Sequence, residues 1–193
     1  TPNLSTLAAK FQRVQLDHLY EWMGRAMHPV ENMPDYGANI ASRNVEGALR
    51  LMLNDSVEAK KPLLINYVQA GIDWGHMLMN GMRWTNRETN GGHNIGRKLP
   101  ITFTAVLLDN QAMKDAVSNA GIDAFDENGS IYLNRNNVPV FGQITGYEEA
   151  YWYYIATQSG ARTHSDPYAY IDGGDSGEWY QVCCISQPFK GMA

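Results

Sequence analysis

Apolar residues recur at helical spacing through the first half of the chain, and this periodicity limits the fold more than any other feature of the sequence. It predicts helices over residues 4–25, 39–53 and 57–80. Asp55, with Glu58 three residues later, resembles the capping box that begins many helices, and it precedes the third predicted helix. Helices paired in this way predict a mainly α-helical fold of helical hairpins packed side by side.

Shorter elements are expected further along the chain. Pro100 suits the first turn of a helix, and the apolar run over residues 101–108 is predicted to be a buried helix or strand. Residues 111–119 are predicted to form a helix that Gly121 ends. The remaining expected elements are a small β-hairpin (129–133 with 138–141), helices over 148–157 and 178–184, and a loop over 163–177. The large side chains expected to fill the core include Trp74, Met77, Met79 and Met82.

Length and charge set the broad class of protein. A chain of 193 residues is expected to form one domain, residues 1–193, with a substantial core. The net charge of −5 argues against a nucleic-acid partner, and no apolar run approaches the about 20 residues that span a bilayer. The chain starts without Met and ends on a semi-apolar segment, so we expect it to be part of a longer protein.

The densest group of polar side chains lies in a glycine-rich stretch, residues 91–100. This stretch places His93, Asn94, Arg97 and Lys98 among three glycines, directly before an apolar run. Polar groups on such a loop favour a functional site, and the local excess of basic residues favours anionic substrates. The alternatives are a turn in which Arg97 and Lys98 face water, and structural roles for His93 and Arg97.

Four blocks of sequence carry a resemblance to a known family. They are Trp22-x-Gly24-Arg25 with His28-Pro29 and residues 31–37; residues 61–65 with 68–73; Gly91-Gly92-His93-x-x-Gly96-Arg97-Lys98; and Tyr180-x-x-Cys183-Cys184. Together they resemble bacterial (α/α)-toroid proteins of the polysaccharide-lyase and six-hairpin-glycosidase type. The resemblance implies a secreted or periplasmic protein with an all-α toroid of helical hairpins and a small β-hairpin insertion. The toroid is expected to be partial, because the chain offers fewer hairpins than such toroids need.

The resemblance also implies cleavage of an anionic, uronate-containing polysaccharide by β-elimination. Such a reaction must neutralise the uronate carboxylate, remove the neighbouring proton and protonate the leaving oxygen. The expected catalytic residues are Asn32 and Arg97 on the carboxylate, His93 as base or neutraliser, and Tyr147 or Tyr180 as the acid–base tyrosine. Residues expected to bind substrate, two of them tryptophans that can stack on sugar rings, are Arg25, His28, Tyr36, Trp84, Asn94, Lys98 and Trp179.

Two other functions stay open at this point. A glycoside hydrolase on the same scaffold needs a pair of carboxyl groups, for which Glu31 with Asp35, or Glu148 with Glu149, are the candidates. The second is a non-catalytic carbohydrate-binding or structural protein. No cofactor is expected, and calcium bound by oxygen ligands is a minor alternative. Its candidate ligands are Asp166, Asp172, Asp175 and Glu178.

Overall fold

The structure, a computed structural model, describes most of the first two thirds of the chain. The described residues are 1–15, 32–34, 36–85, 94–121, 123–129, 131–133, 137, 139–141 and 191–192. The chain divides into two compact units, Thr1–Asp126 and Glu127–Ala193, where the sequence predicts a single domain.

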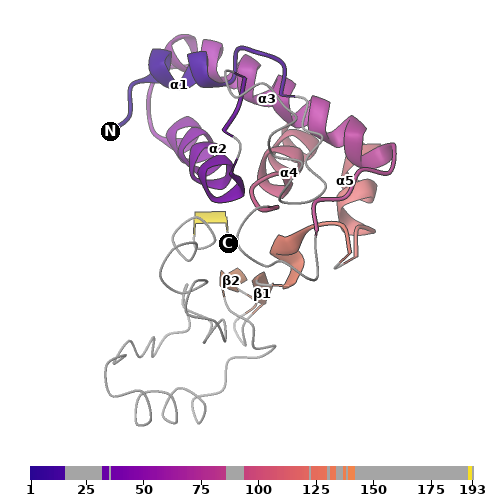
Figure 1. The fold of residues 1–193 in the computed structure, drawn as a ribbon. Helices are drawn as coiled ribbons and strands as arrows, with labels where there is room; N and C mark the ends of the chain where they lie inside the picture. Colours follow the sequence, from indigo (N-terminus) through magenta and orange to yellow (C-terminus); the bar gives the residue numbers. More distant parts are fainter. Residues whose placement is uncertain are drawn as a thin grey trace, which may run out of the picture. The chain divides into compact units, whose positions relative to one another are not determined.

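The first unit is helical, as the periodicity predicts (Figure 1). Its helices are α1 (Leu4–Lys10), α2 (Gly37–Met52), α3 (Val57–Met79), α4 (Lys98–Leu107) and α5 (Gln111–Ser118). The long helix α3 packs against each of the other four. The mainly α-helical class is therefore confirmed for the described residues, and the toroid stays a prediction.

The predicted helix over residues 4–25 is wrong over residues 11–15, because α1 ends at Lys10, and its remainder, 16–25, lies outside the described residues. The amide groups of Phe11 and Gln12 donate to the carbonyl groups three residues earlier, which tightens the last turn. Phe11 then turns into the core, where its ring meets Tyr67 edge-on with centroids 5.1 Å apart. Val14, which continues the apolar period, is 55% exposed. Packing of Phe11 thus overrides the periodicity.

The second and third helices lie where they are predicted, but the start of α3 differs in its cap. Ser56 caps the helix, because its hydroxyl oxygen accepts a hydrogen bond from the amide of Ala59 at 3.3 Å. Asp55, the expected capping residue, pairs instead with Arg50 near the end of α2. This ion pair joins the two ends of the α2–α3 connection.

The run over 101–108 proves to be helical, with Pro100 in the first turn of α4 as predicted. α4 lies very close to α3 at Gly71, where an added Cβ would come within 2.0 Å of the hydroxyl oxygen of Thr104. A glycine is therefore required at this crossing. The helix α5 ends at Ser118, and its C-cap is Asn119 rather than Gly121, since the amide of Asn119 donates to the last turn.

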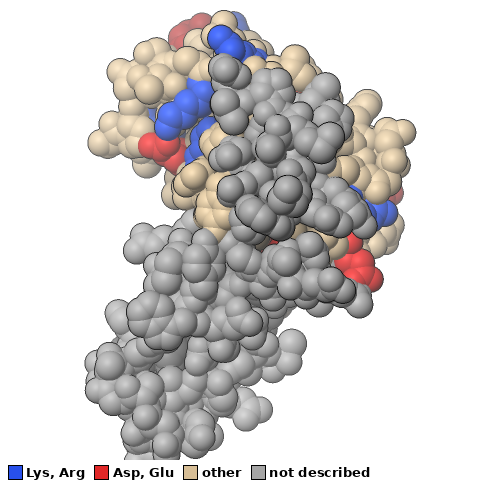
Figure 2. All heavy atoms as spheres, viewed as in Figure 1, with Lys and Arg blue, Asp and Glu red and all other residues tan. Residues whose placement is uncertain are grey.

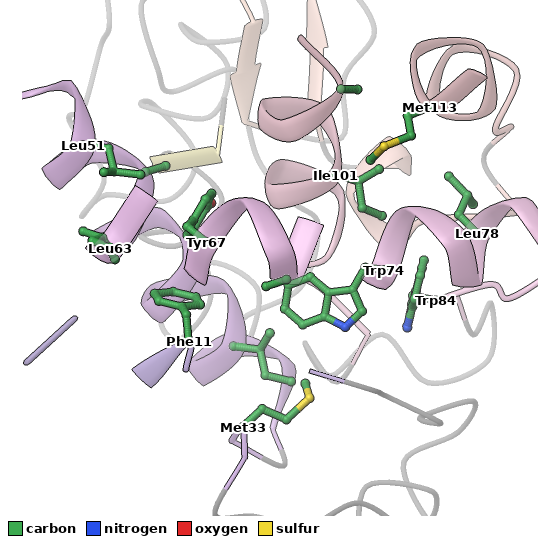
Figure 3. Close-up of a cluster of buried hydrophobic side chains, with 14 of the residues drawn as sticks. Phe11, Met33, Leu51, Leu63, Tyr67, Trp74, Leu78, Trp84, Ile101 and Met113 are labelled. Atoms are coloured by element: carbon green, nitrogen blue, oxygen red, sulfur yellow. The ribbon is translucent and has the colours of Figure 1, made fainter. Parts of the chain in front are cut away.

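The core of this unit forms around α3. Figure 3 shows Tyr67 and Trp74 on α3, with Ile101 of α4 and Met113 of α5 among the side chains around them. Trp74 is fully buried, as expected. Two of the three methionines predicted to fill the core, Met77 and Met82, pack against it. The third, Met79, is 41% exposed at the end of α3, so its core assignment is wrong.

In the second unit the described residues include a short antiparallel hairpin. Strand β1 (Ile131–Leu133) pairs with β2 (Pro139–Phe141), and Tyr132 lies opposite Val140. The predicted small hairpin is confirmed. A 3₁₀ turn, Asp126–Gly129, precedes it. The helices predicted over 148–157 and 178–184, and the loop over 163–177, lie outside the described residues.

Candidate functional site

A pocket of about 590 Å³ lies beside α1 and α2, and it includes one of the predicted catalytic residues, Asn32. Pockets that bind small molecules commonly have volumes of about 300–1,000 Å³. In the view of Figure 2, basic side chains gather on the described surface over α1 and α2, next to an acidic one. The lining residues are Ala9, Lys10, Asn32, Met33, Pro34, Asn39, Ser42, Arg43 and Glu46.

One face of α2 supplies four of these side chains. Asn39, Ser42, Arg43 and Glu46 follow the spacing i, i+3, i+4, i+7, which places them on a single side of a helix. All four can donate or accept hydrogen bonds, and two are charged. This side of α2 is therefore polar, whereas most residues on its other sides are buried.

Arg43 holds parts of the pocket lining together through its hydrogen bonds. Its side chain is almost fully buried, and Nη2 donates to the side-chain oxygen of Gln15 at 2.6 Å. Nη1 donates to the backbone carbonyl groups of Lys10 and Asn32, each at 3.4 Å. The guanidinium group also lies 4.9 Å from the centre of the Phe11 ring. Arg43 thus holds the end of α1 and residue 32 at one point.

Asn32 is positioned by its backbone and keeps its side chain available. Its carbonyl oxygen accepts hydrogen bonds from Arg43 and, at 2.8 Å, from the side-chain amide of Gln15. Across the described part of the chain, the side-chain amide of Asn32 has no hydrogen-bond partner of its own. It is half-buried and lines the pocket. A rigidly held asparagine in the lining of an open pocket is suited to binding a polar ligand.

The other predicted site segment, residues 94–97, lies in the interior. Asn94 and Arg97 are both fully buried, and Nη1 of Arg97 donates to the carbonyl oxygen of Ile95 at 2.7 Å. Gly96 has a φ of +105°, and an added Cβ would come within 2.5 Å of the backbone nitrogen of Ala41. Only glycine suits this conformation and this contact. The segment therefore packs tightly against α2.

A hydrogen bond from Asn44 completes the packing of this segment. Its side-chain nitrogen donates to the carbonyl oxygen of Gly96 at 2.7 Å. By contrast, both polar atoms of the Asn94 side chain are buried without a hydrogen-bond partner in the described structure. Buried polar groups in proteins nearly always have partners. The position of Asn94 is thus fixed by packing rather than by its own amide.

The helix α2 separates the two predicted parts of the site. At 100° per residue, Ala41 and Asn44 project from the side of α2 opposite to Asn39 and Glu46. The pocket lies on one of these sides and the 94–97 segment on the other. The structure therefore does not bring Asn32 and Arg97 to one pocket, although the sequence analysis assigns both to the same carboxylate.

Trp84 is a core residue in this structure rather than an exposed sugar-binding surface. Its side chain is fully buried, and its ring stacks on Phe125 with centroids 5.6 Å apart and planes 16° from parallel. The backbone groups of Trp84 also exchange hydrogen bonds with Ala124 and Asp126. These contacts oppose the predicted role of Trp84 in stacking on a sugar, because stacking needs one face of the ring to be accessible and Trp84 is fully buried.

The remaining described candidates lie at helix starts. Tyr36 is the half-buried residue that precedes α2, where its backbone carbonyl accepts from the amides of Asn39 and Ile40. Lys98 is the half-buried first residue of α4. Neither lines the pocket that contains Asn32. Their predicted contacts with substrate stay predictions.

Several predicted residues lie outside the described part of the chain. They include the expected base His93, both acid–base tyrosines and three substrate-binding candidates, namely Tyr147, Tyr180, Arg25, His28 and Trp179. The carboxyl pairs of the hydrolase alternative and the candidate calcium ligands also lie outside it. Within the described ranges, no group of three or more His, Cys, Asp or Glu residues is placed to hold a metal ion, and no helix is both long and apolar enough to cross a membrane.

Sequence reasoning missed Lys10, Gln15, Arg43 and Glu46, which shape the pocket around Asn32. The spacing of polar residues along α2 is the signal that points to two of them. No family model matches this chain, and neither the curated proteins nor the solved structures include one with significant similarity to it. The resemblance to (α/α)-toroid proteins thus stays a prediction, and the chemistry has to be argued from the pocket itself.

Proposed function

We propose that this protein binds an anionic, uronate-containing glycan in the pocket beside α1 and α2 and cleaves it by β-elimination. The observation that carries the proposal is the side-chain amide of Asn32, which has no hydrogen-bond partner among the described residues and lies in a pocket that also contains Lys10 and Arg43. An amide donor beside positive charge stabilises a carboxylate and the negative charge that develops next to it during elimination. Sugar hydroxyl groups find further partners in Asn39 and Ser42.

The charge of the pocket favours elimination over hydrolysis. A glycoside hydrolase needs two carboxyl groups on opposite sides of the bond that breaks. Among the described lining residues the only carboxylate is that of Glu46, and it is ion-paired with Lys10 at 3.0 Å. A lyase instead needs a neutraliser, a base and an acid. Asn32 supports the first role, and Tyr147 or Tyr180 is the proposed acid–base residue.

Ultraviolet absorbance tests the proposal, because elimination leaves a conjugated double bond in the product and hydrolysis does not. The protein is incubated with a panel of uronate polysaccharides, alongside Asn32→Ala and His93→Ala. Asn54→Ala is the matched control, since Asn54 is exposed and does not line the pocket. We expect the absorbance to rise at the same rate for the unmodified protein and the control. For Asn32→Ala we expect the rate of this rise to be lower by at least about tenfold.

Other outcomes assign the protein differently. New reducing ends without absorbance would indicate a hydrolase, and binding without turnover would indicate a carbohydrate-binding protein. If Asn32→Ala retains the full rate, neither Asn32 nor this pocket takes part in the reaction. Circular dichroism of each variant shows whether the fold is intact. We expect the spectrum of Asn32→Ala to differ little from that of the unmodified protein, because the Asn32 side-chain amide makes no hydrogen bond within the described residues.

A further inference from the structure

An ion pair between α1 and α2 forms part of the pocket lining. Nζ of Lys10, the last residue of α1, lies 3.0 Å from Oε2 of Glu46 on α2. The two side chains are 41% and 35% exposed. Both residues line the pocket that contains Asn32. The ammonium group of Lys10 is therefore the cation in this lining that solvent and ligands reach most readily.

Arg43 is the other described cation of the lining, and it is hydrogen-bonded to groups of the protein itself. Its side chain is only 6% exposed, and its terminal nitrogens donate to Gln15 and to the carbonyl groups of Lys10 and Asn32. Replacing these partners with a ligand would release the end of α1 from residue 32. Arg43 therefore contributes positive charge and position, and direct contact with a ligand falls to Lys10.

The partner of Lys10 is exchangeable. Ion pairs between partly exposed side chains contribute little to stability, because water solvates both charges and holding two long side chains in place costs entropy. A ligand carboxylate can replace the Glu46 carboxylate at little cost to the fold. A neutral sugar hydroxyl cannot replace it on equal terms, since hydrogen bonds between charged groups are roughly twice as strong as neutral ones.

We propose that the Lys10–Glu46 pair sets the charge selectivity of the pocket. Lys10 leaves Glu46 to bind the carboxylate of an anionic sugar, and Glu46 acts as an internal competitor of that carboxylate for the ammonium group. The hydrogen bonds from one nitrogen of Arg43 to the carbonyl oxygens of Lys10 and Asn32 keep these residues together, so the ammonium and the Asn32 amide serve one ligand. This inference rests on the proposed function and names the specificity residue of the same site.

The two members of the pair are expected to have opposite effects on affinity. Lys10→Met removes the charge but keeps much of the apolar length of the side chain, so affinity for an anionic sugar falls about tenfold. Glu46→Gln removes the competing charge and the repulsion of the ligand, so affinity for the same sugar rises about threefold. Neither change alters affinity for a neutral sugar by more than about twofold, because no charge on the ligand is involved.

Isothermal titration calorimetry with a matched pair of ligands tests this proposal. The probes are a saturated trimer of galacturonate and its fully methyl-esterified form, which differ in charge but share the sugar rings. Lys114→Met is the control variant, since Lys114 is partly exposed, pairs with the exposed Asp109 and does not line the pocket. We expect the unmodified protein and the control to bind the acid trimer more tightly than the ester. Lys10→Met should erase this preference, and Glu46→Gln should increase it.

Two results would overturn the proposal, and they are distinguishable. If the unmodified protein binds the acid trimer and both Lys10→Met and Glu46→Gln bind it equally well, the pair is not the selector, while the proposed function stands. If the unmodified protein binds neither trimer nor any longer uronate polymer, the proposed function fails and the selector fails with it. Because Glu46→Gln is expected to improve binding, loss of folding cannot imitate its effect.

Discussion

The pocket beside residue 32 and the segment before α4 each contain a buried arginine and an asparagine, but the two asparagines lie in opposite surroundings. Near residue 32, Arg43 is buried with hydrogen bonds to Gln15 and backbone carbonyl groups, and the Asn32 amide faces a pocket. Before α4, Arg97 and Asn94 are both fully buried against the other side of α2. The difference shows that residue type alone does not identify a site. The side chain of Asn32 is available to a ligand because Arg43 and Gln15 hold its backbone in place.

The largest effect is expected where the interior segment touches α2. Gly96→Ala places a Cβ 2.5 Å from the backbone nitrogen of Ala41 and forces a positive φ on alanine. Together these are expected to lower the free energy of unfolding by about 3 kcal/mol or more. Chemical denaturation measures the loss. Gly121→Ala is the control, since among the described residues no atom beyond its chain neighbours lies within 4 Å of an added Cβ. Equal stability of the two variants would contradict the tight packing of this segment.

A smaller difference in stability is expected between variants of two asparagines near Gly96. Asn44 contacts Gly96 from α2, and Asn94 lies two residues before it in the sequence. Asn44→Leu removes the hydrogen bond to the carbonyl of Gly96 and is expected to cost about 1–3 kcal/mol of unfolding free energy. Asn94→Leu replaces an amide without a partner in the described structure by an apolar group of similar shape, so it should be neutral or slightly stabilising. The two variants are compared by denaturation. A loss at Asn94 as large as that at Asn44 would show that the Asn94 amide has a partner.

The smallest effect is a pH dependence at the α2–α3 connection. The hydrogen-bonded Arg50 guanidinium lowers the pKa of Asp55 below its ordinary value. The stability that this pair contributes is therefore fully present above the ordinary pKa of an aspartate, about 3.9, and is lost as the pH falls through the lowered pKa of the folded state. Denaturation midpoints measured from pH 7 to pH 2 should fall less steeply for Asp55→Asn than for the unmodified protein. Identical slopes would contradict the prediction.

Local patterns predict much of this fold. The apolar period and the turn residues gave α2, α3, the first turn of α4 and the β1–β2 hairpin. The end of α1 is different, because it depends on Phe11 meeting Tyr67 and on Arg43 taking the carbonyl of Lys10. These partners lie more than thirty residues away in the sequence. No local pattern contains such contacts, so the sequence predicts that the first helix continues past Lys10, where α1 ends.

The candidate site was less predictable than the fold. The sequence predicts that Asn32 contacts the carboxylate, and Asn32 lines a pocket in the structure. Arg97 was selected for its charge, yet the positive φ of Gly96 lets its segment pack beneath α2 and takes the guanidinium group into the interior. Lys10 and Glu46 lie on different helices and meet only in the folded chain. Burial and long-range pairing decide these roles, and neither can be read from residue type.

Nuclear magnetic resonance of the asparagine side-chain amides tests most directly whether the ligand binds beside α1 and α2. Signals are assigned by their loss in Asn32→Ala and Asn94→Leu, and the galacturonate trimer is then added to the unmodified protein. We predict that the Asn32 amide signals shift with saturation as the trimer binds, while the Asn94 signals stay in place. Shifts at Asn94 without shifts at Asn32 would contradict the account and place the ligand on the other side of α2.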